Sequence, residues 1–229
     1  MKRASAVEAA SAVELSRGER SLVVRFAETQ RMCSWAIVNG GFTDAQAVGW
    51  IEVRDGELKP PVDARRVLRA RLAQAGAVGA VGLLTSRDVT TFVDAASHDR
   101  DVRSRCIATV GLGNALRAGD PPGPAARIGT INLLCHIDVA LTDEALLEAM
   151  SIATEARTAS ILDAGVPSLR SGLPATGTGT DCIVMATPLA GRREPYAGKH
   201  TRIGHVVAAA VAEAVRRGAA EWKAERGTA

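Results

Sequence analysis

Aromatic residues are scarce in this chain, and its basic residues form no block. Only 3% of the residues are aromatic, and 28 basic side chains stand against 25 acidic ones, which gives a formal net charge of +3. Proteins that bind nucleic acid usually carry a basic stripe or aromatic side chains on which bases stack. The composition therefore argues against a nucleic-acid partner.

Long apolar runs are missing as well. No stretch approaches the roughly 18 continuous apolar residues that a membrane-spanning helix needs. The chain begins with basic residues, but Glu8 and Glu14 interrupt the apolar core that a signal peptide requires. We therefore expect a cytoplasmic protein with no membrane partner.

The cysteines show no spacing typical of metal ligands. Cys33, Cys106, Cys135 and Cys182 lie far apart in apolar runs, with no C-x-x-C or Cys/His motif. A reduced cysteine in such a run behaves as a small core residue, which fits a reducing compartment. We expect no metal site.

Apolar runs typical of strands alternate with helical patterns along the 229 residues, of which 47% are hydrophobic. The predicted strands are 22–26, 33–38, 48–53, 78–85, 106–112, 129–138 and 182–187. The predicted helices are 64–76, 87–96, 142–162 and 200–218. Thr142 is a favourable N-cap for the third helix, and Gly165 followed by Pro167 is a stop signal.

This pattern predicts an α/β fold in which a mixed β-sheet, in one or more layers, is covered by helices. Residues 33–96 and 106–218 can each be parsed as strand, strand, helix, strand, helix. This division leaves an internal duplication open. However, any α/β chain can be divided in this way, and no residue-level similarity between the two halves supports a duplication.

A glycine-rich turn precedes the last predicted strand, in residues 175–187, ATGTGTDCIVMAT. Gly177 and Gly179 permit tight backbone angles and the close approach of a ligand. The hydroxyls of Thr178 and Thr180 and the carboxylate of Asp181 complete an arrangement that resembles a binding site. Neither common nucleotide fingerprint applies, and plain turn chemistry is the alternative.

Polar residues also follow other predicted strands or begin a helix, where α/β folds assemble their sites. Asn39 lies in VNGG, Asn114 in ATVGLGNALRAGD, and His200 and Thr201 in YAGKHTRIG. Both asparagines equally suit left-handed turns. The position of His200 at a helix start favours a neutral imidazole, which can act as a base.

Glu155 is a second candidate for proton transfer. It stands among small and apolar residues in SIATEARTASIL, where burial would raise its pKa, and Arg157 is a less certain helper. By contrast, His136 within INLLCHID is typical of a core residue, and His205 of a solvent-facing one.

Five segments taken in order resemble the adenosylcobinamide amidohydrolase family, CbiZ. They are ATVGLGNALRAGD, GTINLL, ATEARTASILDAGV, ATGTGTDCIVMAT and YAGKHTRIGHVV, and the early CSWAIVNGGF is similar as well. The resemblance spans roughly residues 20–218 of a single domain, with flexible termini outside it. It implies hydrolysis of the amide that joins aminopropanol to the corrin ring of adenosylcobinamide, giving adenosylcobyric acid for coenzyme B12 salvage. The corrinoid is then substrate, and no cofactor is expected.

Amide hydrolysis suggests roles for these residues. Asp181 or His200 would activate water, and Glu155 would be the other proton carrier. We expect the loop 177–180 to hold the oxyanion, with a nucleophilic Thr178 or Thr180 as an alternative. The predicted substrate-binding residues are Gly177, Thr178, Gly179, Thr180, Asn39, Asn114 and Thr201.

Two other functions remain open: an acyltransferase, and a corrinoid-binding or regulatory module without chemistry. A pure binder has no need of proton carriers that converge, so separation of Asp181, Glu155 and His200 would favour binding. We expect the segments GTGTD and GKHTRIG to share one pocket. A homo-oligomer is also left open.

Overall fold

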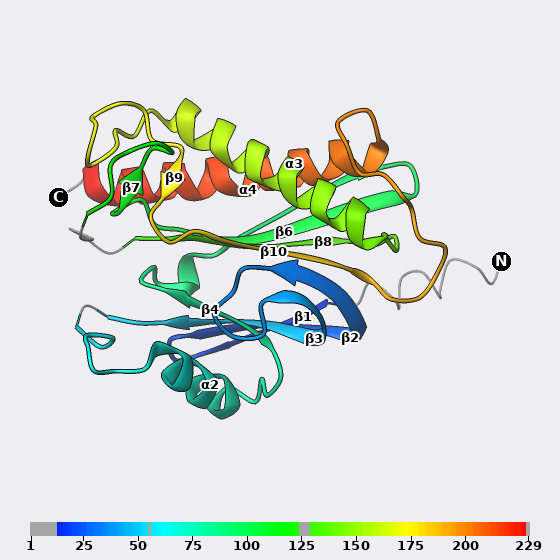
Figure 1. The fold of residues 1–229 in the computed structure, drawn as a ribbon, viewed down its shortest axis with the longest axis horizontal. Helices are drawn as coiled ribbons and strands as arrows, with labels where there is room; N and C mark the ends of the chain where they lie inside the picture. Colours follow the sequence, from blue (N-terminus) through cyan, green and yellow to red (C-terminus); the bar gives the residue numbers. More distant parts are fainter. Residues whose placement is uncertain (1–12, 55, 124–128, 228–229) are drawn as a thin grey trace.

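The chain is built as two β layers packed face to face, with helices outside each (Figure 1). The computed structural model describes residues 13–54, 56–123 and 129–227. The strands are β1 (Val13–Gly18), β2 (Ser21–Ser34), β3 (Gly41–Glu52), β4 (Val81–Thr85), β5 (Val93–Asp99), β6 (Val102–Val110), β7 (Ala115–Leu116), β8 (Ile131–Ile137), β9 (Gly177–Thr178) and β10 (Cys182–Pro188). The helices are α2 (Ala64–Gln74), the 3₁₀ turn η1 (Val89–Thr91), α3 (Asp143–Ala164) and α4 (Arg202–Gly227).

Eight strands form one mixed sheet in the order β4-β3-β2-β10-β8-β6-β5, with β1 paired to β2. The long strand β2 joins the two layers, because its first half pairs with β1 and its second half with β10. Its pairing with β3 is irregular between Arg25 and Gln30. The sheet therefore bends, and its two halves face each other.

The core between the layers comes from alternate side chains of both halves, as the two-residue period of strands requires. Leu22 and Trp50 from the lower half and Leu134 and Val184 from the upper half are all buried in one cluster. The two β layers are therefore held together by apolar packing as well as by the β2–β10 ladder.

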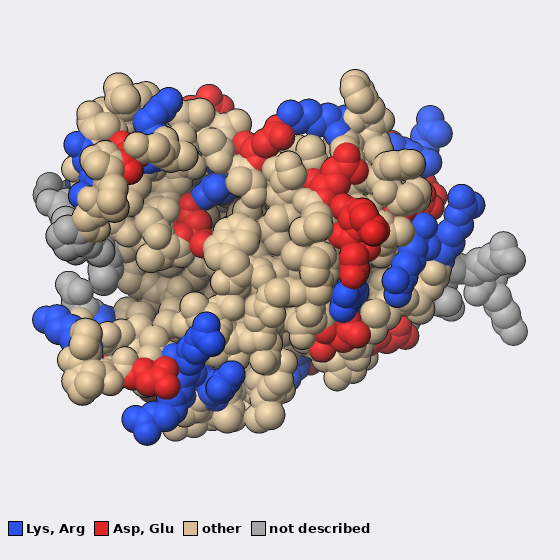
Figure 2. Space-filling view, viewed as in Figure 1, with Lys and Arg blue, Asp and Glu red and all other residues tan. Residues whose placement is uncertain are grey.

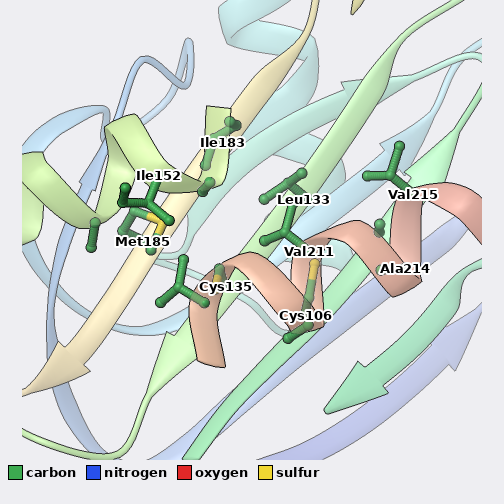
Figure 3. Packing of buried hydrophobic residues seen from close by; sticks show 14 of the residues in the cluster. Cys106, Leu133, Cys135, Ile152, Ile183, Met185, Val211, Ala214 and Val215 are labelled. Atoms are coloured by element: carbon green, nitrogen blue, oxygen red, sulfur yellow. The ribbon is translucent and has the colours of Figure 1, made fainter. Parts of the chain in front are cut away.

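A second core lies between the upper layer and helices α3 and α4 (Figure 3). Val211, Ala214 and Val215 of α4 face Cys106 and Leu133 of the sheet. The alanine-rich helices approach the sheet closely, which leaves little exposed area on this side of it. The four cysteines are buried thiols, as predicted for reduced core residues.

Helix α2 covers the lower layer. Asp63 caps it by accepting hydrogen bonds from the backbone N–H groups of Arg65 at 2.9 Å and Arg66 at 3.2 Å. Leu68 and Leu72 are its buried residues, and they pack in the cluster on the outer face of β3 and β4. None of the helices in the described part of the chain is both long and apolar enough to cross a membrane.

The predicted α/β class is confirmed, and so are most elements. α3 begins after its cap Thr142 and ends at Gly165, whose φ of 67° is left-handed. Each half of the chain contains the same unit, two antiparallel strands, a helix and a strand parallel to the second. These units are β2-β3-α2-β4 and β6-β8-α3-β10.

Three sequence-based boundaries are wrong. The predicted strand 22–26 is part of the longer strand β2, which runs on to Ser34, and of the predicted strand 33–38 only residues 33 and 34 belong to β2, because residues 35–38 form the turn after it. The predicted helix 87–96 is the turn η1 followed by β5, whose backbone pairs with β6 along its whole length. The C-terminal tail is not frayed through residue 227, because α4 continues and buries Ala219 in the core.

Candidate active site

A cavity of about 520 Å³ lies where the two β layers separate. Figure 2 shows the molecule hollowed on its left side, between the part that carries α3 and α4 and the part that carries α2. Its lining is mostly apolar and comes from both layers. It consists of residues 35–37, 53, 58, 82–86, 114, 129, 130, 132 and 179–182. The cavity therefore lies at the amino-terminal starts of the central strands β8 and β10 and beside the carboxyl end of β4, as a concave and mostly apolar site between the two layers.

Asp181 is the carboxylate of this lining, and its oxygens bind four donors of the protein. Oδ2 accepts from Arg157 Nη1 and from the backbone N–H of Thr178 at 3.0 Å. Oδ1 accepts from the Thr178 hydroxyl and from the backbone N–H of Ile131 at 3.0 Å. The two side chains of the ion pair are only 8% and 11% exposed. Asp181 thus ties the glycine-rich turn to α3 and to the start of β8.

Gly177 is required by this ion pair. A Cβ at residue 177 would overlap Asp181 Oδ2 and lie 2.5 Å from Arg157 Nη1. A side chain at this position would therefore push apart the two groups that hold the turn. The glycine seen in the sequence serves close packing inside the protein, and Gly177 itself does not line the cavity.

Asn114 lies on the opposite side of the turn. A Cβ at Gly179 would lie 2.8 Å from Asn114 Nδ2, so the glycine lets the amide side chain approach the backbone. The Gly179 N–H donates to the Asn114 carbonyl at 3.2 Å. Within the described residues the Asn114 side chain makes no hydrogen bond, and it lines the cavity. Its amide is available to a ligand.

Three further polar side chains of the cavity lining donate to backbone carbonyls of the protein. The Thr180 hydroxyl donates to the Gly129 carbonyl at 3.0 Å, and the Thr130 hydroxyl donates to the Thr180 carbonyl at 2.7 Å. Asn132 donates to the Leu84 carbonyl at 2.6 Å. The bond of Asn132 in β8 to Leu84 in β4 joins the two β layers, and the two threonine bonds join the segments that precede β8 and β10.

Cys182 also lines the cavity, but its thiol is a poor nucleophile. Burial raises the pKa of Cys182 to about 12, with a smaller opposing effect from the hydrogen bond of Trp35. The thiolate form, which is the reactive one, is therefore scarce near neutral pH. Chemistry in this cavity falls to oxygen and nitrogen groups.

His200 and Thr201 do not line the cavity. They lie in the turn before α4, which begins beyond the far end of β10 from Asp181 (Figure 1). His200 is exposed, and the Thr201 hydroxyl accepts from the backbone N–H of Gly204 at 2.9 Å, which caps the helix. The structure therefore does not bring GTGTD and GKHTRIG together in this cavity.

Glu155 is not buried, contrary to the expectation from its apolar neighbours in the sequence. Its side chain is 52% exposed and forms an ion pair with Lys199. Because successive helix residues differ by about 100°, Glu155 and Arg157 point to nearly opposite sides of α3. Arg157 points toward Asp181, and Glu155 points away from it.

Asn39 adopts a left-handed backbone conformation with a φ of 54°, which is the turn role that the sequence analysis gave as the alternative to a binding role. Its side chain donates to the carbonyls of Gly79 at 3.1 Å and Ala80 at 2.9 Å. Like His200, Thr201 and Glu155, it is absent from the cavity lining. Its contacts anchor the turn after β2.

Trp35 is a cavity residue that the sequence analysis missed. Its side chain is 49% exposed, and its Nε1 donates to the Asp181 carbonyl at 2.5 Å. The available signal was a tryptophan at a strand end in a chain with few aromatic residues. Among the described residues, no group of three or more His, Cys, Asp or Glu side chains is placed to hold a metal ion.

Comparisons with known proteins agree with the resemblance. The family model described as adenosylcobinamide amidohydrolase, CbiZ, matches residues 5–227, a longer span than the 20–218 expected. An adenosylcobinamide amidohydrolase of Halobacterium salinarum is 32% identical over 190 residues, which cover 78% of this chain and 75% of that protein. An uncharacterised protein of Methanocaldococcus jannaschii is 38% identical over 93 residues, or 40% of this chain and 36% of that protein.

Among solved structures, a protein of Pyrococcus horikoshii OT3 aligns over 86% of this chain and 76% of its own. The TM-score is 0.44 at 10% identity, a likeness too weak to carry functional weight. The family model covers nearly the whole chain, and the halobacterial relative supports the same amidohydrolase class. This protein belongs to the adenosylcobinamide amidohydrolase family.

Proposed function

We propose that this protein hydrolyses the amide that joins aminopropanol to the corrin ring of adenosylcobinamide, releasing aminopropanol and adenosylcobyric acid. The reaction would return a corrinoid to coenzyme B12 synthesis, so the proposed role is salvage. The observation that carries the proposal is the interlayer cavity, which combines the Asp181 network with the uncommitted amide of Asn114.

The chemistry of the substrate fits this cavity. A corrin ring has broad apolar faces and carries amide side arms, and the cavity has apolar walls with a few polar groups. Its volume of about 520 Å³ suits one side arm and an edge of the ring rather than the whole corrinoid. We therefore propose that the aminopropanol arm enters and that the ring lies at the mouth.

Asn114 is our proposed donor to the carbonyl oxygen of the scissile amide. The loop amides expected in this role are used inside the protein, since the N–H of Thr178 binds Asp181 and that of Gly179 binds Asn114. Asn114 Nδ2 has no such partner among the described residues. One well-aimed donor to a developing oxyanion stabilises the transition state by about 3 kcal/mol.

Asp181 is our proposed proton carrier. A water oxygen would bond to the amide carbon while its proton passes to Asp181, and that proton would then pass to the amine nitrogen as the C–N bond breaks. Attack by Thr178 followed by hydrolysis of the ester is the alternative, because the Thr178 hydroxyl donates to Asp181, but Thr178 is outside the cavity lining, which favours water as the nucleophile. His200 and Glu155 lie outside the cavity lining, so we assign neither of them a step. Their separation from Asp181 is the arrangement that the sequence analysis named as favouring a pure binder, and hydrolysis is favoured here by membership of an amidohydrolase family.

Incubation of the purified protein with adenosylcobinamide in H₂¹⁸O, followed by mass analysis, tests the function. We expect adenosylcobyric acid that carries one ¹⁸O atom in its new carboxylate. Asn114→Ala should fold normally, because no side-chain hydrogen bond is lost, and should turn over about 10²-fold more slowly. A corrinoid that binds but is returned unchanged would favour the non-catalytic binding module.

A further inference from the structure

The mouth of the cavity presents an unusually exposed aromatic side chain, Trp35. This indole is 49% exposed, whereas Trp50 is fully buried in the core between the layers. Trp35 and Ile37, which is 38% exposed, both line the cavity. Together with Leu58 from the lower layer they give the entrance an apolar surface. Exposed apolar groups gathered at a cavity mark ligand contact more often than chance exposure does.

The turn that carries Trp35 is anchored at its second half to β4 and the residues that lead into it. Val38 accepts a hydrogen bond from the Gly82 N–H at 3.0 Å, and Asn39 donates to the carbonyls of Gly79 and Ala80. The indole itself is fixed by the bond from Nε1 to the Asp181 carbonyl at 2.5 Å. Trp35 thus offers a flat surface whose orientation is set before a ligand arrives, which reduces the entropy that binding costs.

We propose that Trp35 is the platform on which the corrin ring of the substrate rests. The inference builds on the proposed function, because it identifies the ring contact of that same site. The apolar edge and face of a corrin gain binding free energy by packing on an indole face. Because the indole N–H holds the backbone of Asp181, the residue that contacts the ring also positions the turn that carries the proposed proton carrier.

Two substitutions separate these contributions. Trp35→Ala removes both the ring surface and the N–H, whereas Trp35→Phe keeps an aromatic surface and removes the bond to Asp181. We expect Trp35→Ala to weaken corrinoid binding by about tenfold or more. Trp35→Phe should bind within about threefold of the native protein, and its kcat should fall several-fold because Asp181 is less well positioned.

The probe for binding is adenosylcobyric acid, which keeps the ring and lacks the scissile amide, so its affinity does not depend on hydrolysis. Quenching of the remaining tryptophans by the coloured corrinoid measures the affinity in every variant. Phe42→Ala is the matched control. Phe42 is also an exposed aromatic, at 40%, but it packs on Arg31 and is not part of the cavity lining. It should bind as the native protein does.

The outcomes are distinct. The proposed role of Trp35 is refuted if Trp35→Ala binds adenosylcobyric acid with native affinity, or if Phe42→Ala loses as much affinity as Trp35→Ala. It is also refuted if the native protein does not bind adenosylcobyric acid. Loss of binding in Trp35→Ala alone supports it, even when the native protein leaves adenosylcobinamide intact. That last result would refute the proposed hydrolysis and leave the ring contact standing.

Discussion

Replacing Asp181 by Asn probes the buried ion pair that organises the glycine-rich turn. The amide oxygen can still accept from Ile131 N–H and the Thr178 hydroxyl, but the new NH₂ group faces Arg157 Nη1 and Thr178 N–H. Two donors lose their acceptor, and the Arg157 charge is left nearly buried at 11% exposure. Breaking a buried pair by removing one partner costs about 3–5 kcal/mol, and solvent screens these groups little.

We therefore expect Asp181→Asn to lower the free energy of unfolding by about 3 kcal/mol, measured by urea denaturation followed by circular dichroism. Asp94→Asn is the matched control. Arg105 donates to both oxygens of Asp94, at 2.9 and 2.6 Å, but the two side chains are 32% and 35% exposed. Asp94→Asn should therefore lower the free energy of unfolding by about 1 kcal/mol or less.

A double variant, Arg157→Met with Asp181→Asn, completes the cycle. Its loss of unfolding free energy should be clearly smaller than the sum of the losses in the two single variants, because each single change leaves the other partner without its hydrogen-bonding group. The reasoning fails if Asp181→Asn lies within about 1 kcal/mol of the native protein, the scale of an exposed pair, or if Asp94→Asn costs as much as Asp181→Asn.

Two further changes test the packing of the fold. Burial lowers the pKa of His136 from 6.5 to about 4, so below pH 6.5 the unfolded chain takes up a proton that the folded protein refuses until about pH 4. Stability should fall by up to about 3 kcal/mol as the pH drops through this window. In urea titrations at several pH values, His136→Gln should reduce this dependence of stability on pH, whereas the exposed control His205→Gln should leave it unchanged. An unchanged dependence in His136→Gln would contradict its assignment to His136. Gly177→Ala should lower the free energy of unfolding by about 2 kcal/mol, because the new Cβ clashes with Asp181 and Arg157. Gly111→Ala is the control, since its new Cβ has no neighbour closer than 3.5 Å, and it should lose less than half as much. Equal melting temperatures of the two variants in thermal unfolding would argue against the clash.

The elements that the sequence predicts well are those whose ends are chemically marked. Thr142 accepts from the N–H of Ala145, and Gly165 ends α3 in a left-handed conformation, as their positions indicate. Residues 87–96 carry a start signal, since Asp88 accepts from the N–H of Thr90 at 2.8 Å and caps the turn η1, but no glycine or proline marks an end. Their apolar spacing fits a short helix, but Val93 and its successors pair with β6, and that partner is set by the tertiary fold.

The candidate site could be predicted only in part, because sequence spacing does not tell which side of an element faces the cavity. Gly179, Thr180, Asp181 and Asn114 do line it, because the turn before β10 and the segment after β6 meet at the same edge of the sheet. Glu155 has apolar sequence neighbours, yet its own side of α3 faces solvent. His200 follows β10 in the chain and therefore lies beyond the end of that strand away from the cavity.

The strand β2 has a consequence for how the chain acquires its fold during synthesis. Gln30 of β2 pairs with Pro188 of β10, so β2 is synthesised long before this partner strand. Until β10 emerges, the inner face of β2 and β3 lacks the partners Val184 and Ala186, and an apolar surface stays uncovered. Such distant pairing slows folding and favours aggregation of incomplete chains. A ribosome-bound chain that stops before β10 would thus be a natural client for a chaperone.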